Sequence, residues 1–149
     1  MRLDFQLAEP TTGTESWPQA DEEDFRYRTA LGDLILEIGS KNFSTHWGWV
    51  PLIDLAASLR HIAKKLQQSG RTETFEFTES ESWLRFSRQG DQVIITASYS
   101  PGEAQVEYAQ FVDAIKKLSK RLRDELLQRN SALAENPAFQ RLLPEEGAE

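Results

Sequence analysis

The sequence predicts an α+β fold: an antiparallel sheet of about five to seven strands, with two main helices packed on one face and a short C-terminal helix. Two stretches, around residues 51–69 and 109–126, repeat apolar residues at helical spacing. Several shorter stretches alternate apolar and polar residues, which is typical of half-buried strands. Turn residues separate these stretches, which favours antiparallel pairing. With 149 residues, the chain is expected to form a single domain over 1–149.

The N-terminal part is predicted to supply three strands. Leu3, Phe5 and Leu7 alternate with polar neighbours, so residues 2–7 are expected to form a half-buried strand. A hairpin is predicted over 25–38, because alternation continues on both sides of a Gly-Asp pair at 32–33. Residues 39–42 are predicted to form another turn, and residues 8–24 an acidic loop or arm.

The most regular helical pattern runs from Pro51 to about Ser69. Seven apolar residues make one continuous stripe along it: Leu52, Leu55, Ala56, Leu59, Ile62, Ala63 and Leu66. Pro51 suits the first helical turn, and Gly70 is expected to end the helix.

The C-terminal half is predicted to contain a meander of strands followed by helices. Alternation indicates strands over 72–78, 81–88 and 92–99, and a shorter strand over 104–108. The second long helix is expected to begin near Ala109. Asn136 and Pro137 are typical of a helix start, so a short helix is predicted to run through Leu143. Residues 145–149 are predicted to be a flexible acidic tail.

Negative charge is concentrated at the two ends of the chain. Residues 1–24 contain seven acidic side chains against one arginine, and residues 145–149 contain three more, within a formal net charge of −7. Acidic ends either meet a basic partner or keep the chain soluble.

Composition argues against several classes of protein. No apolar run reaches the length of a membrane span, and the N-terminus lacks the apolar core of a secretory signal. The chain has no cysteine, which excludes disulfides and thiolate chemistry. A cytoplasmic protein without a membrane partner is therefore expected.

No catalytic or metal motif is present. His46 and His61 are the only histidines and lie fifteen residues apart, unlike zinc ligands, so neither a metal nor another cofactor is expected. Nucleotide-binding loops and serine nucleophile motifs are also missing. Glu73 and Glu76 offer paired carboxylates, but solvated strand positions explain them equally well.

One helix carries a dense basic segment. Its members are Lys116, Lys117, Lys120, Arg121 and Arg123. Such a segment is typical of a solvated helix face, and neighbouring acidic residues can pair with it. An interaction surface is the alternative. Nucleic-acid binding is not expected in a chain with a pI near 4.9.

Seven residues are candidates for binding a protein partner: Asp21, Glu22, Glu23, Asp24, Trp49, Trp83 and Arg85. The acidic run 21–24 either forms a solvated linker or docks on a cationic surface. Trp49 belongs to an aromatic segment, 46–51, that either plugs the start of the first long helix or forms a binding hot spot. Trp83 and Arg85 fall out of phase with the apolar residues of their strand, so both are expected on the solvent face.

Two motifs carry a family resemblance over roughly residues 25–144. The start of the first long helix reads W-x-x-V-P-L-x-D-x-A over 47–56. The C-terminal end of the matched region reads N-P-x-x-Q-x-L-L-P over 136–144. Both resemble motifs of small bacterial proteins. In size, acidity and α+β layout, such chains also resemble immunity proteins that neutralise polymorphic bacterial toxins. The resemblance implies a binding protein and supplies no catalytic residues.

These observations predict a non-enzymatic protein-binding module. The leading hypothesis is an immunity protein that occludes the active site of a toxin or effector, with a basic toxin domain as the partner. The alternatives are a chaperone or adaptor, or an antagonist of a phage or host defence system. A small enzyme with an unrecognised site ranks third.

Overall fold

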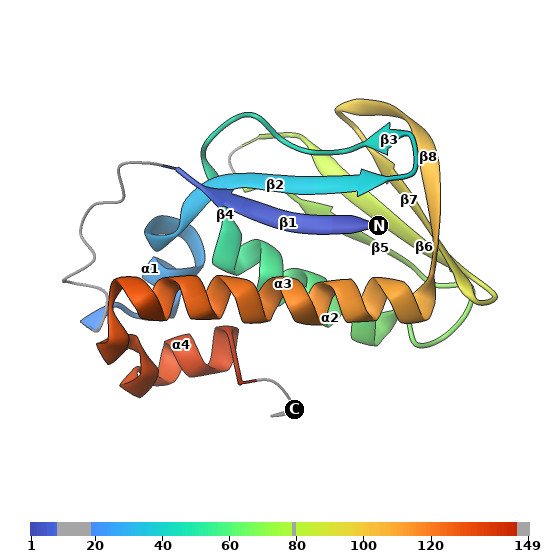
Figure 1. The fold of residues 1–149 in the computed structure, drawn as a ribbon. Helices are drawn as coiled ribbons and strands as arrows, with labels where there is room; N and C mark the ends of the chain where they lie inside the picture. The colour runs from blue at the N-terminus through green and yellow to red at the C-terminus, as the bar shows by residue number, and fades with distance from the viewer. Residues whose placement is uncertain (9–18, 79, 146–149) are drawn as a thin grey trace.

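The computed structural model describes residues 1–8, 19–78 and 80–145 of the chain. Within these ranges the protein has an α+β fold, which confirms the predicted class (Figure 1). Its strands form two four-stranded antiparallel sheets instead of the single sheet that was expected. One continuous hydrophobic core joins the sheets and the helices. No helix in the described ranges is both long and apolar enough to cross a membrane.

The first sheet is built around one central strand. Strand β2 (Leu31–Ile38) pairs with β1 (Arg2–Leu7) on one side, and with β3 (Lys41–Asn42) and β4 (Val50–Pro51) on the other. Both edges of β2 are therefore occupied, by β1 on one side and by β3 and β4 on the other.

The second sheet is a meander of four consecutive strands, as predicted. It contains β5 (Thr72–Glu76), β6 (Trp83–Gln89), β7 (Gln92–Ala97) and β8 (Ser100–Glu107), paired in that order. Strand β8 begins four residues earlier than expected and is paired with β7 across an irregularity at Thr96 and Ala97. The edges of this sheet are therefore β5 and β8.

The predicted hairpin over 25–38 is wrong in its first half. The chain forms a helical turn, α1 (Glu22–Asp24), that continues into a π-helical turn, η2 (Phe25–Thr29). Asp21 caps this segment by accepting a hydrogen bond from the Asp24 amide at 2.8 Å. The Thr29 hydroxyl donates to the Phe25 carbonyl, a contact between residues four apart. Local helical contacts thus outweigh the apparent alternation, and residues 32–33 lie inside β2 instead of in a turn.

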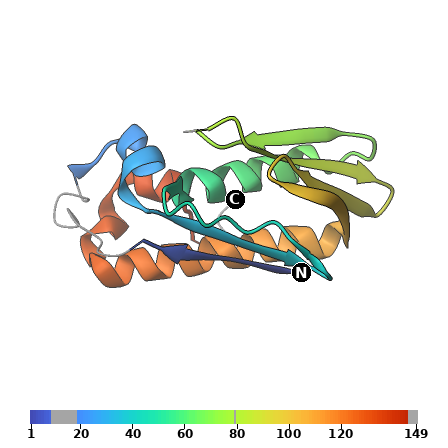
Figure 2. The same cartoon turned by 90° about the horizontal axis from the view of Figure 1, so that it is seen from above.

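Both long helices were predicted, although the first ends at Lys65, before the expected end near Ser69, and Pro51 lies just before its first turn. They are α2 (Leu52–Lys65) and α3 (Tyr108–Arg129), and they lie side by side, with α3 crossing the molecule below β1 and β2 (Figures 1 and 2). The apolar stripe of α2 is buried along its length. Helix α3 contacts β1 of the first sheet as well as β7 and β8 of the second, so it connects the two halves of the fold.

The C-terminal helix is confirmed and is anchored by polar contacts. After a 3₁₀ turn, η3 (Ser131–Glu135), α4 spans Pro137–Leu142. The Asn136 side chain caps α4, as predicted, by accepting hydrogen bonds from the amides of Ala138 and Phe139. Arg123 of α3 is only 6% exposed and donates to the Leu143 carbonyl at 2.8 Å. This contact fixes α4 against α3.

Two further hydrogen bonds join distant parts of the chain. The Arg121 guanidinium donates to the Leu3 carbonyl at 2.6 Å and so ties α3 to β1. The Tyr99 hydroxyl donates to the Phe43 carbonyl at 2.6 Å and links the end of β7 to the segment after β3. Burial raises the pKa of the Tyr99 phenol, which therefore stays neutral and keeps its proton to donate.

Candidate functional site

The acidic run Asp21–Asp24 forms an ordered turn whose charges are partly satisfied within the chain. Asp24 accepts a hydrogen bond from Arg28 at 2.9 Å, and Glu23 lies 3.9 Å from the same guanidinium. Glu22 lies 3.9 Å from Arg141 of α4. The run is thus part of α1 and not a loop, although most of its side chains remain exposed to solvent. The rest of the predicted arm, 9–18, lies outside the described residues.

The predicted C-terminal tail is described only at its first residue. Glu145 is exposed, and its carboxylate lies 3.4 Å from the buried guanidinium of Arg123. Residues 146–149 lie outside the described residues. The described end of the chain therefore contacts α3.

Trp49 belongs to an aromatic cluster near the start of α2. Its ring stacks on Trp47 with centroids 5.1 Å apart, and Trp47 also meets Phe77 and Tyr99 edge-on. Both tryptophans are half-buried. These contacts favour the structural interpretation of Trp49, as part of the plug between α2 and the second sheet, over a binding role.

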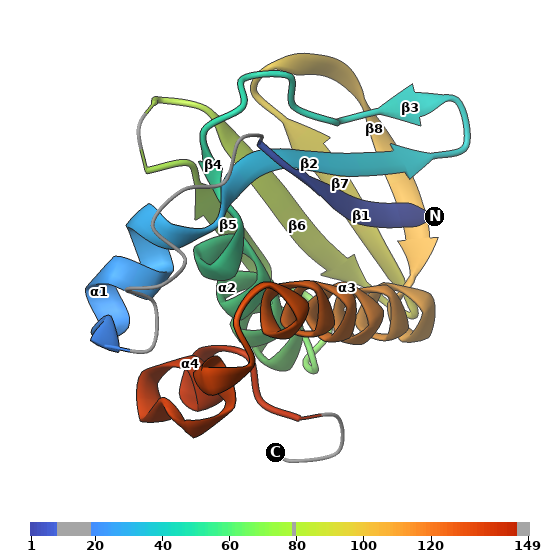
Figure 3. The ribbon, with the colours of Figure 1, turned by 60° about the vertical axis from the view of Figure 1, so that its left-hand side comes forward.

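One face of the second sheet points away from the core. We call it the open face and define it by six residues: Thr74, Trp83, Arg85, Ile94, Thr96 and Gln105. The residues that alternate with them are buried, and among these Phe86 packs against Phe111 of α3 at 5.4 Å. Figure 3 views the sheet from this inner side, with β2 and α3 in front of it. The open face is therefore the opposite, outward side of β5–β8.

Trp83 and Arg85 are brought together on the open face. The Arg85 guanidinium carbon lies 4.1 Å from the centroid of the Trp83 ring, a cation–π contact. The Arg85 Nε also donates to the Thr74 hydroxyl at 3.4 Å. Trp83 is half-buried, whereas Arg85 is exposed. Both residues thus lie on the solvent side of the sheet as predicted, in contact with each other.

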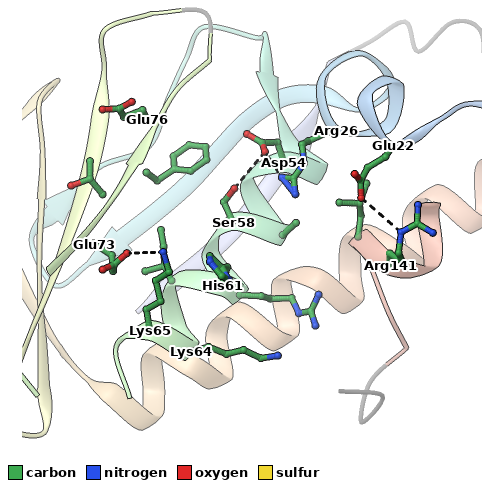
Figure 4. Close-up of a pocket in the computed structure, with 16 residues that line it drawn as sticks. Glu22, Arg26, Asp54, Ser58, His61, Lys64, Lys65, Glu73, Glu76 and Arg141 are labelled. Atoms are coloured by element: carbon green, nitrogen blue, oxygen red, sulfur yellow. Dashed lines mark hydrogen bonds and ion pairs between the residues drawn. The ribbon is translucent and has the colours of Figure 1, made fainter. Parts of the chain in front are cut away.

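A second surface feature was not anticipated. A hollow of about 620 Å³ lies between β5 and α2 and extends to α1, η2 and α4 (Figure 4). We call it the charged groove, and its charged or titratable lining residues are Glu22, Arg26, Asp54, Arg60, His61, Lys64, Lys65, Glu73, Glu76 and Arg141.

Ion pairs occupy the two sides and the base of the charged groove. Lys65 of α2 lies 3.4 Å from Glu73 of β5, which joins the helix to the sheet edge. Asp54, which is buried in the first turn of α2, accepts a hydrogen bond from Arg26 at 2.7 Å. Ser58 donates to the same carboxylate at 3.4 Å (Figure 4).

Four titratable groups in the groove have no ion-pair partner among the described residues. Arg60 and Lys64 lie four residues apart on α2, with His61 beside them, and Glu76 lies across the groove on β5. Lys64 and Arg60 also line a smaller hollow between α2 and α3, together with Lys116. The α2 side of the groove is therefore the side with uncompensated positive charge.

Of the residues weighed as catalytic candidates, the carboxylate pair lies in one hollow and His46 lies outside it. Glu73 and Glu76 line the charged groove with His61, but His46 does not line it. Within the described residues, no three His, Asp or Glu side chains are grouped as metal ligands would be.

The basic segment of α3 is largely paired. Lys117 contacts Asp113 at 3.0 Å, Lys120 contacts Asp124 at 2.9 Å, and Arg121 contacts Asp4 at 3.3 Å. This pairing favours the interpretation as a solvated and structural helix face.

Sequence reasoning missed the charged groove because its lining comes from five separate elements. The spacing of Arg60 and Lys64 was the available signal, since residues four apart share one face of a helix. No known protein family, curated protein or solved structure matches this chain.

Proposed function

We propose that this protein is a non-enzymatic binding module that acts in the cytoplasm and neutralises a partner protein. Within this class, an immunity protein that occludes the active site of a bacterial toxin or effector domain is the leading assignment. The partner makes its main contact with the open face of the second sheet.

The paired Trp83 and Arg85 are the observation that carries this proposal. Tryptophan and arginine are among the residues most enriched at binding hot spots, because they bury a large area and keep a polar group for hydrogen bonding. Stacking at 4.1 Å restricts both side chains before any partner arrives. Restriction in the unbound protein lowers the entropy lost on binding.

The acidic turn α1 supports the choice of a basic partner. Its exposed carboxylates and the net charge of −7 attract a cationic surface over the distance allowed by salt screening. Because its side chains already pair with Arg28 and Arg141, we assign α1 to steering the encounter and not to anchoring the complex.

The test starts with a pull-down by tagged protein from a lysate of the organism that encodes the chain. The retained partner is then purified, its toxicity is measured in growing cells, and its affinity is titrated with three proteins: wild type, Trp83→Ala and Lys117→Ala. Loss of a hot-spot tryptophan costs about 2 kcal/mol or more, so Trp83→Ala is expected to bind about 30-fold more weakly. Lys117→Ala, on the exposed side of α3, is the control and is expected to match wild type.

The proposal also predicts the outcome of neutralisation. Wild-type protein is expected to abolish the partner's toxicity at a one-to-one ratio, whereas Trp83→Ala is expected to need a large excess. Equal binding and equal protection by wild type and Trp83→Ala would refute the open face as the interface.

A further inference from the structure

The outer edge of β5 has backbone groups that point away from the sheet. At the two ends of this strand, the Phe77 amide donates to Ser82 and the Arg88 amide donates to the Arg71 carbonyl. Hydrogen-bonded pairs alternate along an antiparallel ladder, so Glu73 and Phe75 also bond to β6. The amides and carbonyls of Thr72, Thr74 and Glu76 therefore point outwards from β6.

The charged groove begins at this edge. Residues 73–76 of β5 form one side of the groove, and the exposed side of α2 forms its base (Figure 4). A strand added beside β5 would lie about 4.8 Å from it, over the groove. Its backbone would pair with the outward-pointing groups, and alternate side chains would face α2.

The unpaired positive charges of the groove favour an added strand that carries acidic side chains. On the α2 side, Arg60 and Lys64 have no ion-pair partner among the described residues. They are separated by about 6 Å along the helix axis. Alternate residues of a strand are about 6.6 Å apart, so two carboxylates at alternate positions match this spacing.

We infer that the outer edge of β5 and the charged groove together bind an extended acidic segment of a partner protein, which adds to the second sheet as a further strand. This inference goes beyond the neutralising role proposed for the open face. It concerns the strand edge and the groove, which share only Thr74 with the open face, and it holds even if the open face binds nothing.

The test uses an end-blocked seven-residue peptide that alternates glutamate with valine, and a second peptide with lysine in place of glutamate. Each is titrated into ¹⁵N-labelled protein and followed by amide chemical shifts. The glutamate peptide is expected to shift the amides of Thr72, Thr74 and Glu76 together with those of Arg60 and Lys64. An affinity near 1 mM, about 4 kcal/mol, suffices for detection. The lysine peptide is expected to bind at least about tenfold more weakly.

Two variants separate strand addition from simple charge attraction. Thr74→Pro removes an outward-pointing amide while leaving the backbone bonds to β6 in place, and proline is tolerated on edge strands. Both Thr74→Pro and Thr74→Val lose the hydroxyl that accepts from Arg85, so their comparison isolates the amide. It is expected to weaken peptide binding about tenfold, whereas Thr74→Val is expected to bind as wild type does. Lys64→Glu is expected to weaken binding similarly, and Lys117→Glu serves as its charge-matched control.

Three results would overturn the inference. The first is the absence of shifts in β5 at about 5 mM glutamate peptide, a concentration that detects even millimolar binding. The second is unchanged binding by a folded Thr74→Pro protein. The third is a single-stranded DNA oligomer that shifts the groove residues more strongly than the peptide. Trp83→Ala is expected to leave peptide binding unchanged, so failure of this inference and failure of the open-face proposal are distinguishable.

Discussion

The ion pair between Arg26 and Asp54 gives a quantitative test of how the charged groove is held together. The Asp54 side chain is 9% exposed and that of Arg26 is 29% exposed. In Arg26→Met, the one side-chain contact that the described part of the chain still offers this buried carboxylate is the Ser58 hydroxyl at 3.4 Å. Breaking a fully buried pair costs about 3–5 kcal/mol, and the partial exposure of Arg26 reduces this figure to about 2–3 kcal/mol. The melting temperature is expected to fall by about 5–10 °C.

The assay is urea unfolding of wild type, Arg26→Met, Asp54→Leu and the double variant, analysed as a double-mutant cycle. The double variant leaves no unpaired charge in the interior, so it is expected within about 1 kcal/mol of wild type. Lys117→Met removes one partner of an exposed pair and is the control, with an expected change below about 0.5 kcal/mol. If Arg26→Met changes stability no more than Lys117→Met, the reasoning from burial is wrong.

Two further predictions concern a buried phenol and a close backbone contact. Because burial raises the pKa of Tyr99, only the unfolded chain ionises this phenol just above pH 10, and the free energy of unfolding then falls by about 1.4 kcal/mol per pH unit. Urea unfolding between pH 8 and 11 should show a smaller loss for Tyr99→Phe, and parallel profiles would refute the assignment. In Gly32→Ala, the new Cβ would lie 2.0 Å from the Gln6 carbonyl oxygen, so a loss above about 3 kcal/mol is expected. Gly90→Ala, at a turn with φ of +61° and open space, should lose only about 1–2 kcal/mol, and equal losses would contradict the steric argument.

The elements that sequence predicted well are those whose signal is local. The apolar stripe of α2 and the Asn136–Pro137 start of α4 depend on neighbouring residues, and both were found where expected. The meander β5–β8 is also local, because each strand pairs with the next. Trp83 was assigned to the solvent face by the same alternation.

The errors arose where different interactions compete or where distant segments meet. Phe25 and Tyr27 suggested one face of a strand, but Phe25 is 1% exposed and Tyr27 is 38% exposed. The helical contacts of Asp21 and Thr29 decide the conformation of that segment. The pairing of β1 with β2 skips more than twenty residues of sequence, and no local pattern specifies it. For the same reason, the charged groove could not be assembled from its separate elements.

The hydrogen bond from Arg121 to Leu3 has a consequence for synthesis, since it joins residues 118 positions apart. At about 5–20 residues per second, β1 is made about 6–24 s before Arg121 is added to the chain. During this interval the apolar side of β1 and β2 has no α3 to cover it. Uncovered apolar strands are prone to pair with other chains. The N-terminal sheet therefore stays incomplete until α3 has been made, and its apolar side needs protection from other chains during that interval.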